Sequence, residues 1–118
     1  MSLLGIIGWV LLGTVAVSCL VTFWDEIRVW LNNTAANAVE RVLGYGARQR
    51  MHRAVARIDR VVNVIRNQTV VYTKRNSLDT YYDKTTLLAE AQPYEISEDV
   101  LKELSKKGQL VETFEYRQ

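Results

Sequence analysis

Three residue types with special chemistry occur only once each in this chain of 118 residues: Cys, Pro and His. One thiol, Cys19, offers no partner for a disulfide, and such sparse cysteine usage agrees with a reducing compartment. Cys19 and His52 are far apart in the sequence, so no Cys–His pair or metal-binding cluster is predicted. The paired acids Asp79 and Asp83 have no partner base and no Gly-rich phosphate loop. We therefore expect a non-enzymatic protein that holds neither a metal nor a cofactor.

Charge is absent from residues 2–24, SLLGIIGWVLLGTVAVSCLVTFW. As a helix these 23 residues would be about 35 Å long, and a hydrocarbon layer is about 30 Å thick. No Lys or Arg precedes the run, which disfavours a cleaved signal peptide. The sequence thus predicts a retained transmembrane helix over residues 2–24.

Basic residues follow this predicted helix and none precede it, so we expect the carboxy-terminal portion to be cytoplasmic and the amino terminus outside. Trp24 and Trp30 flank the exit and are expected at the membrane interface, where an indole ring is stable. The predicted location is a bacterial inner membrane, crossed once.

Small residues within the predicted span suggest that its copies associate in the bilayer, because they let two helix backbones approach closely. An equally weighted alternative is that Gly is simply frequent in membrane helices. The candidate residues are Gly5, Gly8, Gly13, Thr14 and Ser18. No ionisable side chain other than the thiol lies in the span, so transport is not expected.

Residues 25–68 contain eight Arg, no Lys and four acidic residues, whereas residues 69–118 contain seven basic and nine acidic residues. The first part of this basic middle, residues 25–46, is predicted to be a juxtamembrane helical linker. Asn33 or Thr34 is its expected N-cap. Gly44 and Gly46 are expected to interrupt the helix as a hinge, at a propensity cost of about 2 kcal/mol.

The next segment, residues 47–67, is predicted to be an amphipathic helix with an arginine face. Its apolar residues recur at spacings of four and three and form one stripe: Met51, Val55, Ile58, Val62 and Ile65. Four arginines fall on the opposite side at about 100° per residue: Arg50, Arg53, Arg57 and Arg60.

Three interpretations of this amphipathic segment remain open. The stripe matches about two heptads of a coiled coil and would then associate copies of the chain. It would equally serve as the buried side of an ordinary core helix. In the third interpretation the helix lies on the membrane surface, with its arginines on anionic headgroups. Nucleic acid is not expected as a partner, because no aromatic residues are interleaved with the arginines.

The last segment, residues 69–118, is predicted to be a small α+β unit of order β-β-α-β. Residues 69–73 and 85–91 read as strands and residues 110–116 as the closing strand. Ser97 is the expected N-cap of a helix that begins with Glu98 and Asp99 and stops at Gly108. A unit this small is expected to pack against residues 47–67 or a second copy.

The predicted fold class is therefore a membrane protein: a single N-terminal transmembrane helix, an amphipathic helix and a small α+β (β-β-α-β) C-terminal unit. The leading functional hypothesis is a non-enzymatic membrane anchor or scaffold that self-associates and presents the α+β unit to a cytoplasmic protein. Its expected partners are the lipid bilayer, further copies of the chain and that protein. One alternative is a membrane-perturbing effector of the lysis or defence type. A weaker alternative is a tethered module that binds a ligand or nucleic acid.

Overall fold

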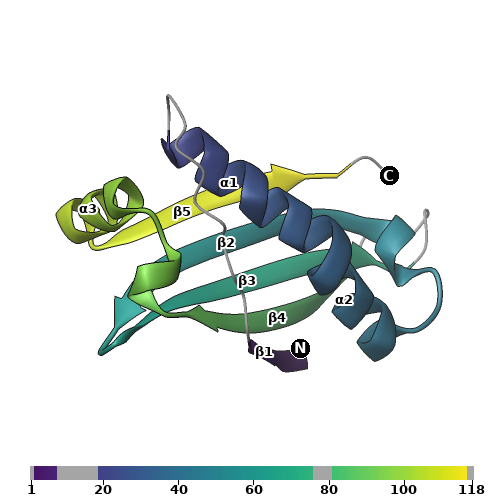
Figure 1. Cartoon of the computed structure of the whole chain (residues 1–118). Coiled ribbons are helices and arrows are strands. Elements are labelled where there is room, and N and C mark those ends of the chain that lie inside the picture. The colour runs from purple at the N-terminus through teal and green to yellow at the C-terminus, as the bar shows by residue number, and fades with distance from the viewer. Residues whose placement is uncertain (1, 8–18, 76–80, 117–118) are drawn as a thin grey trace.

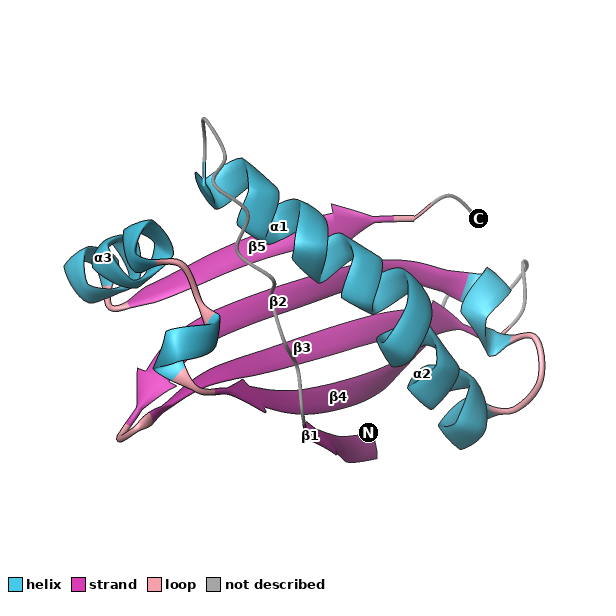
Figure 2. Cartoon of the chain, in the orientation of Figure 1, coloured by secondary structure: helices cyan, strands magenta, loops and turns pink. Residues whose placement is uncertain are grey.

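The computed structural model describes residues 2–7, 19–75 and 81–116, with side chains from residue 21 onward. Five strands form one sheet, and the helices lie on one face of it (Figures 1 and 2). The strands are β1 (Ser2–Ile7), β2 (Met51–Val61), β3 (Val64–Lys74), β4 (Tyr82–Ala91) and β5 (Gln109–Glu115). Their order in the sheet is β1-β4-β3-β2-β5, with β1 parallel to β4 and every other neighbouring pair antiparallel.

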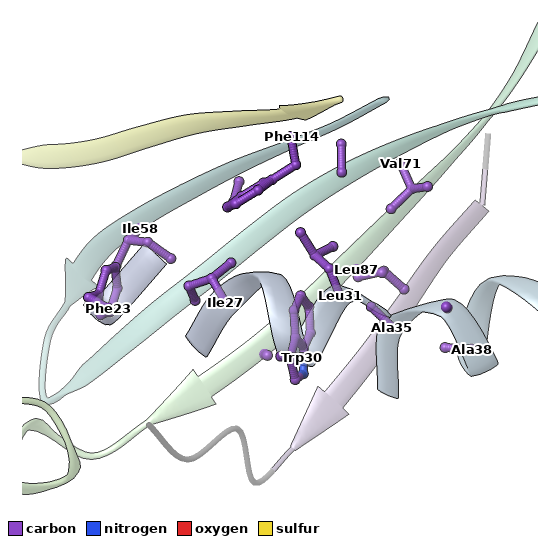
Figure 3. Packing of buried hydrophobic residues seen from close by; sticks show 14 of the residues in the cluster. Phe23, Ile27, Trp30, Leu31, Ala35, Ala38, Ile58, Val71, Leu87 and Phe114 are labelled. Atoms are coloured by element: carbon purple, nitrogen blue, oxygen red, sulfur yellow. The ribbon is translucent and has the colours of Figure 1, made fainter. Parts of the chain in front are cut away.

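A nearly continuous helical segment crosses this sheet diagonally. It consists of α1 (Cys19–Trp30), a π-helical turn (Leu31–Ala35) and α2 (Ala36–Leu43). Its inward side chains recur every three or four residues, which places them on one face. They are Phe23, Ile27, Trp30, Leu31, Ala35, Ala38 and Val39, and all are buried. Figure 3 shows Phe23, Ile27 and Leu31 beside Ile58, Leu87 and Phe114, so the core lies between this segment and the sheet.

The predicted transmembrane helix over residues 2–24 is wrong. Ser2–Ile7 is strand β1, which pairs with β4 from Ser2–Thr85 to Ile7–Glu90, and the end of the apolar run belongs to α1. Phe23 is 3% exposed and packs into the protein core. Among the described residues, no helix is both long and apolar enough to cross a membrane. The single-pass topology depended on that helix and is not supported. The inner-membrane location and the membrane-perturbing alternative stay predictions.

The predicted amphipathic helix over residues 47–67 is also wrong. Its residues form a short 3-10 turn (Ala47–Arg50), β2 and the first part of β3, joined by a tight turn at Val62–Asn63. Val62 has a φ of +55°, a conformation suited to such a turn. The stripe is mostly β-branched residues, which favour strands over helices. The predicted linker, likewise, has no N-cap at Asn33 or Thr34, because the helix runs through both.

The local elements of the carboxy-terminal part agree with their predictions. α3 (Glu98–Lys107) begins at Ser97, whose Oγ accepts a hydrogen bond from the Val100 backbone N at 3.4 Å. It ends at Gly108, where φ is +82°. The predicted strands over 69–73, 85–91 and 110–116 lie within or overlap β3, β4 and β5. Residues 69–118 are not a separate unit, however, since β3 begins in the hairpin with β2 and shares its sheet.

Candidate binding surface on the open face of the sheet

No described element covers the sheet face that points away from α1, α2 and α3. Side chains alternate between the two faces of a strand, so every second residue of β2, β3, β4 and β5 lies on this side, the open face. Its cross-strand neighbours follow from the register of the sheet. The residues are Arg53, Val55, Arg57 and Asp59 on β2, Arg66, Gln68, Val70 and Tyr72 on β3, Lys84, Thr86, Leu88 and Glu90 on β4, and Val111, Thr113 and Glu115 on β5.

One end of the open face carries a basic row, formed by Arg53, Tyr72 and Lys84 on adjacent strands. The Arg53 guanidinium lies 4.6 Å from the centre of the Tyr72 ring, and the Lys84 ammonium lies 5.6 Å from the same centre. Both contacts are cation–π interactions, which hold the two positive charges beside one ring. Neither cation has an ion pair in the described part of the chain. Glu115 on β5 lies opposite Arg53 in the register, so the basic row together with Glu115 has a net charge of about +1 at neutral pH.

An acidic row, formed by Asp59, Arg66 and Glu90, crosses the same three strands at the opposite end. The Arg66 guanidinium donates two hydrogen bonds to Asp59, from Nε to Oδ1 at 3.1 Å and from Nη2 to Oδ2 at 2.8 Å. This bidentate contact raises the pKa of Arg66, and the charge of Glu90 acts in the same direction. With two carboxylates around one guanidinium, the acidic row has a net charge of about −1 at neutral pH.

Between the two rows lies an apolar middle, which consists of Val55, Val70, Leu88 and Val111. The first three are half-buried, and Val111 is 48% exposed. Each of these apolar residues has a polar neighbour two residues away on its own strand: Arg57, Gln68, Thr86 and Thr113. A mixture of apolar and polar side chains of this kind is compatible with a contact surface.

The predicted self-association stripe is divided among three environments. Met51, Ile58 and Ile65 are at most 2% exposed and belong to the core, so they are not available to another chain. Val55 lies in the apolar middle of the open face. Val62 is 84% exposed at the hairpin turn. Only Val55 of the five therefore lies on the candidate surface.

The predicted arginine face is divided as well. Arg53 and Arg57 lie on the open face, four residues apart on β2. Arg50 donates from Nε to the Lys74 carbonyl oxygen at 3.0 Å, which holds it at the end of the sheet. Arg60 lines a shallow cleft beside Leu104 at the end of α3. These four arginines thus do not form one anion-binding face.

The residues predicted for the membrane have other surroundings. Trp30 is 8% exposed in the core, and Trp24 packs its edge against the Phe114 ring with centroids 6.2 Å apart. Gly5 lies in β1 opposite Leu88. The other four candidates for association in the span, Gly8, Gly13, Thr14 and Ser18, lie outside the described residues.

Eight residues of the two charged rows and the apolar middle were missed by sequence reasoning: Asp59, Arg66, Val70, Tyr72, Lys84, Leu88, Glu90 and Val111. The available signal for a strand was the β-branched residues of 64–74, which are Val64, Ile65, Thr69, Val70, Val71 and Thr73. In the ranges 21–75 and 81–116, no group of three or more His, Cys, Asp and Glu residues could hold a metal ion. What the open face offers is a combination of charge and apolar area suited to binding.

Comparisons with protein-family models, with curated proteins and with solved structures gave no match. A role for the open face is therefore argued from its geometry and charge. The side chains of the two charged rows lie on strands that the hydrogen bonds of the sheet hold in a fixed register.

Proposed function

We propose that this chain is a non-enzymatic assembly domain that binds protein through the open face of its sheet. The observation that carries this proposal is the apolar middle, which no described element covers and which charged rows border at both ends. Apolar area at the centre and polar residues at the rim are the usual anatomy of a protein interface. The hydrogen-bonded strands also present this surface with little ordering of the backbone needed on binding.

A substitution in the centre of the surface tests the proposal. We expect Leu88→Arg to lower the association of the purified full chain, because a charge would replace an apolar contact in the middle of the interface. The matched control is Val29→Arg, which places the same side chain on the outward side of α1, where Val29 is 61% exposed. Association is measured by sedimentation velocity over a concentration series.

The two variants separate a specific surface from a general effect of charge. The proposal requires that the Val29 variant associate like the native chain while the Leu88 variant does not. Equal association of all three proteins, or a native chain that stays monomeric throughout the series, would refute it. Circular dichroism of each variant establishes that the fold is retained.

Anion binding at the basic row is a second candidate function. It is favoured by the Arg53 Nε, which is buried without a hydrogen-bond partner among the described residues, and by the neighbouring Lys84 ammonium. Aromatic side chains on which bases stack, together with neighbouring basic residues, are common on surfaces that bind single-stranded nucleic acid. Salt-dependent binding of a fluorescent oligonucleotide, lost in Arg53→Ala, would favour this candidate, and the absence of binding at low salt would remove it.

A further inference from the structure

We infer that the partner of the open face is a second copy of this chain, turned by a two-fold axis that lies in the contact plane across the strands. This inference rests on the proposed function and names the occupant of the same surface. The two copies then pack sheet against sheet, with the basic row of each above the acidic row of the other.

The order of charges across the strands supports this arrangement. On β2, β3 and β4 the basic row reads Arg53, Tyr72 and Lys84, and the acidic row reads Asp59, Arg66 and Glu90. With a two-fold axis across the strands, each strand lies above the same strand of the second copy and runs in the opposite direction. The basic row of one copy therefore lies above the acidic row of the other.

Each member of the basic row then meets a suitable group of the second copy. Arg53 faces the carboxylate on β2, and Lys84 faces the carboxylate on β4. The Tyr72 ring faces the guanidinium on β3, a cation–π pair. A two-fold axis along the strands would instead put basic row against basic row, which like-charge repulsion disfavours.

The dimensions of the open face fit a modest dimer. The rows lie six residues apart on β2, or about 20 Å at roughly 3.4 Å per residue, and the four antiparallel strands are together about 19 Å wide. With the side chains at its ends the face covers on the order of 500 Å² per copy, so a dimer buries about 1,000 Å² in total. This value lies near the lower limit for specific interfaces, so we expect a reversible, concentration-dependent dimer.

A pair of charge reversals tests the arrangement. Lys84 and Glu90 are both exposed on β4 and face each other only across the inferred interface, since they lie six residues apart within one chain. Lys84→Glu alone and Glu90→Lys alone each place two like-charge contacts in a homodimer. We expect either change to weaken association at least about tenfold. Lys84→Gln and Glu90→Gln are the neutral controls and should weaken it less.

An equimolar mixture of the two reversed variants provides the decisive measurement. In a mixed dimer the new carboxylate at position 84 faces the new ammonium at position 90, and the other end keeps its native pair. We therefore expect the mixture to associate to within about threefold of the native chain, as one-to-one dimers visible by native mass spectrometry.

The outcome also distinguishes this inference from the proposed function. Association that is lost in Leu88→Arg but unaffected by either charge reversal would overturn the two-fold arrangement and leave the open face as the binding surface. Reversals that weaken association without rescue in the mixture would overturn it too. A native chain that does not associate would overturn both.

Discussion

Replacing two buried polar residues by apolar ones is expected to stabilise this protein. Asn67 and Thr69 lie on the core side of β3, and neither is exposed to solvent. The Thr69 hydroxyl donates to Asn67 Oδ1 at 2.6 Å, but the Asn67 Nδ2 has no partner in the described part of the chain. A buried donor without a partner costs about 1–3 kcal/mol, whereas a satisfied side-chain hydrogen bond contributes about 1 kcal/mol net.

The double variant Asn67→Val, Thr69→Val removes the unpaired donor together with the one hydrogen bond. It should therefore raise the free energy of unfolding by up to about 2 kcal/mol. Thr69→Val alone should instead lower the free energy of unfolding by about 1–3 kcal/mol, because it leaves both polar groups of Asn67 unpaired. Thr69→Val is nearly isosteric, and the small side chain of Ala89 lies opposite Asn67 on β4.

Urea unfolding at one fixed protein concentration measures these differences, since self-association would otherwise add to the apparent stability. The diagnostic result is the change of sign between the single and the double variant. A double variant that is less stable than the native chain by more than about 1 kcal/mol would refute the reasoning. It would mean that Nδ2 is satisfied in the folded protein, for example by a bound water.

Three further predictions concern single side chains. Arg57→Leu should lower the dissociation constant of the inferred dimer several-fold, because Arg57 would face Val55 of the second copy without a carboxylate opposite. Sedimentation velocity measures this change, and weaker association would contradict the arrangement. Burial raises the pKa of Tyr116 from 10.0 to about 12, so the folded state keeps the phenol proton longer than the unfolded state. The stability contributed by this group is complete below pH 10 and is lost as the pH rises toward 12. Urea unfolding between pH 10 and pH 12 should show that Tyr116→Phe loses less unfolding free energy than the native chain. Equal losses in the two proteins would argue against a buried phenol. Gly108→Ala should lower the unfolding free energy by about 1 kcal/mol or more, because φ there is +82°, and an unchanged urea midpoint would contradict that conformation.

Elements with local signals were predictable from the sequence. Helix α3 has its N-cap at Ser97, acids in its first turn, lysines in its last and Gly108 directly after it, and each signal acts within a few residues. The interruption at Gly44 and Gly46 is of the same kind, since both adopt positive φ. These signals need no knowledge of what the segment packs against.

The β2–β3 hairpin was missed because its spacing imitates a helix. Met51, Ile58 and Ile65 are seven residues apart, which is two helical turns, but seven is odd and would alternate faces along one straight strand. A register irregularity between Met51 and Arg53 changes that alternation, and the turn at Val62–Asn63 brings Ile65 back to the core side. Two local departures from regular geometry thus placed all three residues in the core.

The apolar run was misassigned for a different reason. Mean hydropathy over a window is the same for one long helix and for a strand followed by the start of a buried helix. The better evidence was downstream, where Phe23, Ile27, Leu31, Ala35 and Val39 recur every four residues to the end of α2. An apolar face that continues well past Asp25 and Glu26 indicates a helix packed against protein, and its residues from Phe23 to Val39 lie in the core.

The candidate site could not be assembled from the sequence because its rows exist only across strands. Tyr72 is 19 residues after Arg53 and 12 before Lys84, and only the register puts the ring between the two cations. The same register that builds the basic row places Asp59, Arg66 and Glu90 in one line at the other end. A one-residue shift of β3 would turn Tyr72 and Arg66 into the core, where an unpaired guanidinium is costly. The burial of Ile65 and Val71 therefore determines the register of β3 and with it the positions of both charged rows. The charge complementarity inferred between two copies thus depends on how the core of each copy is packed.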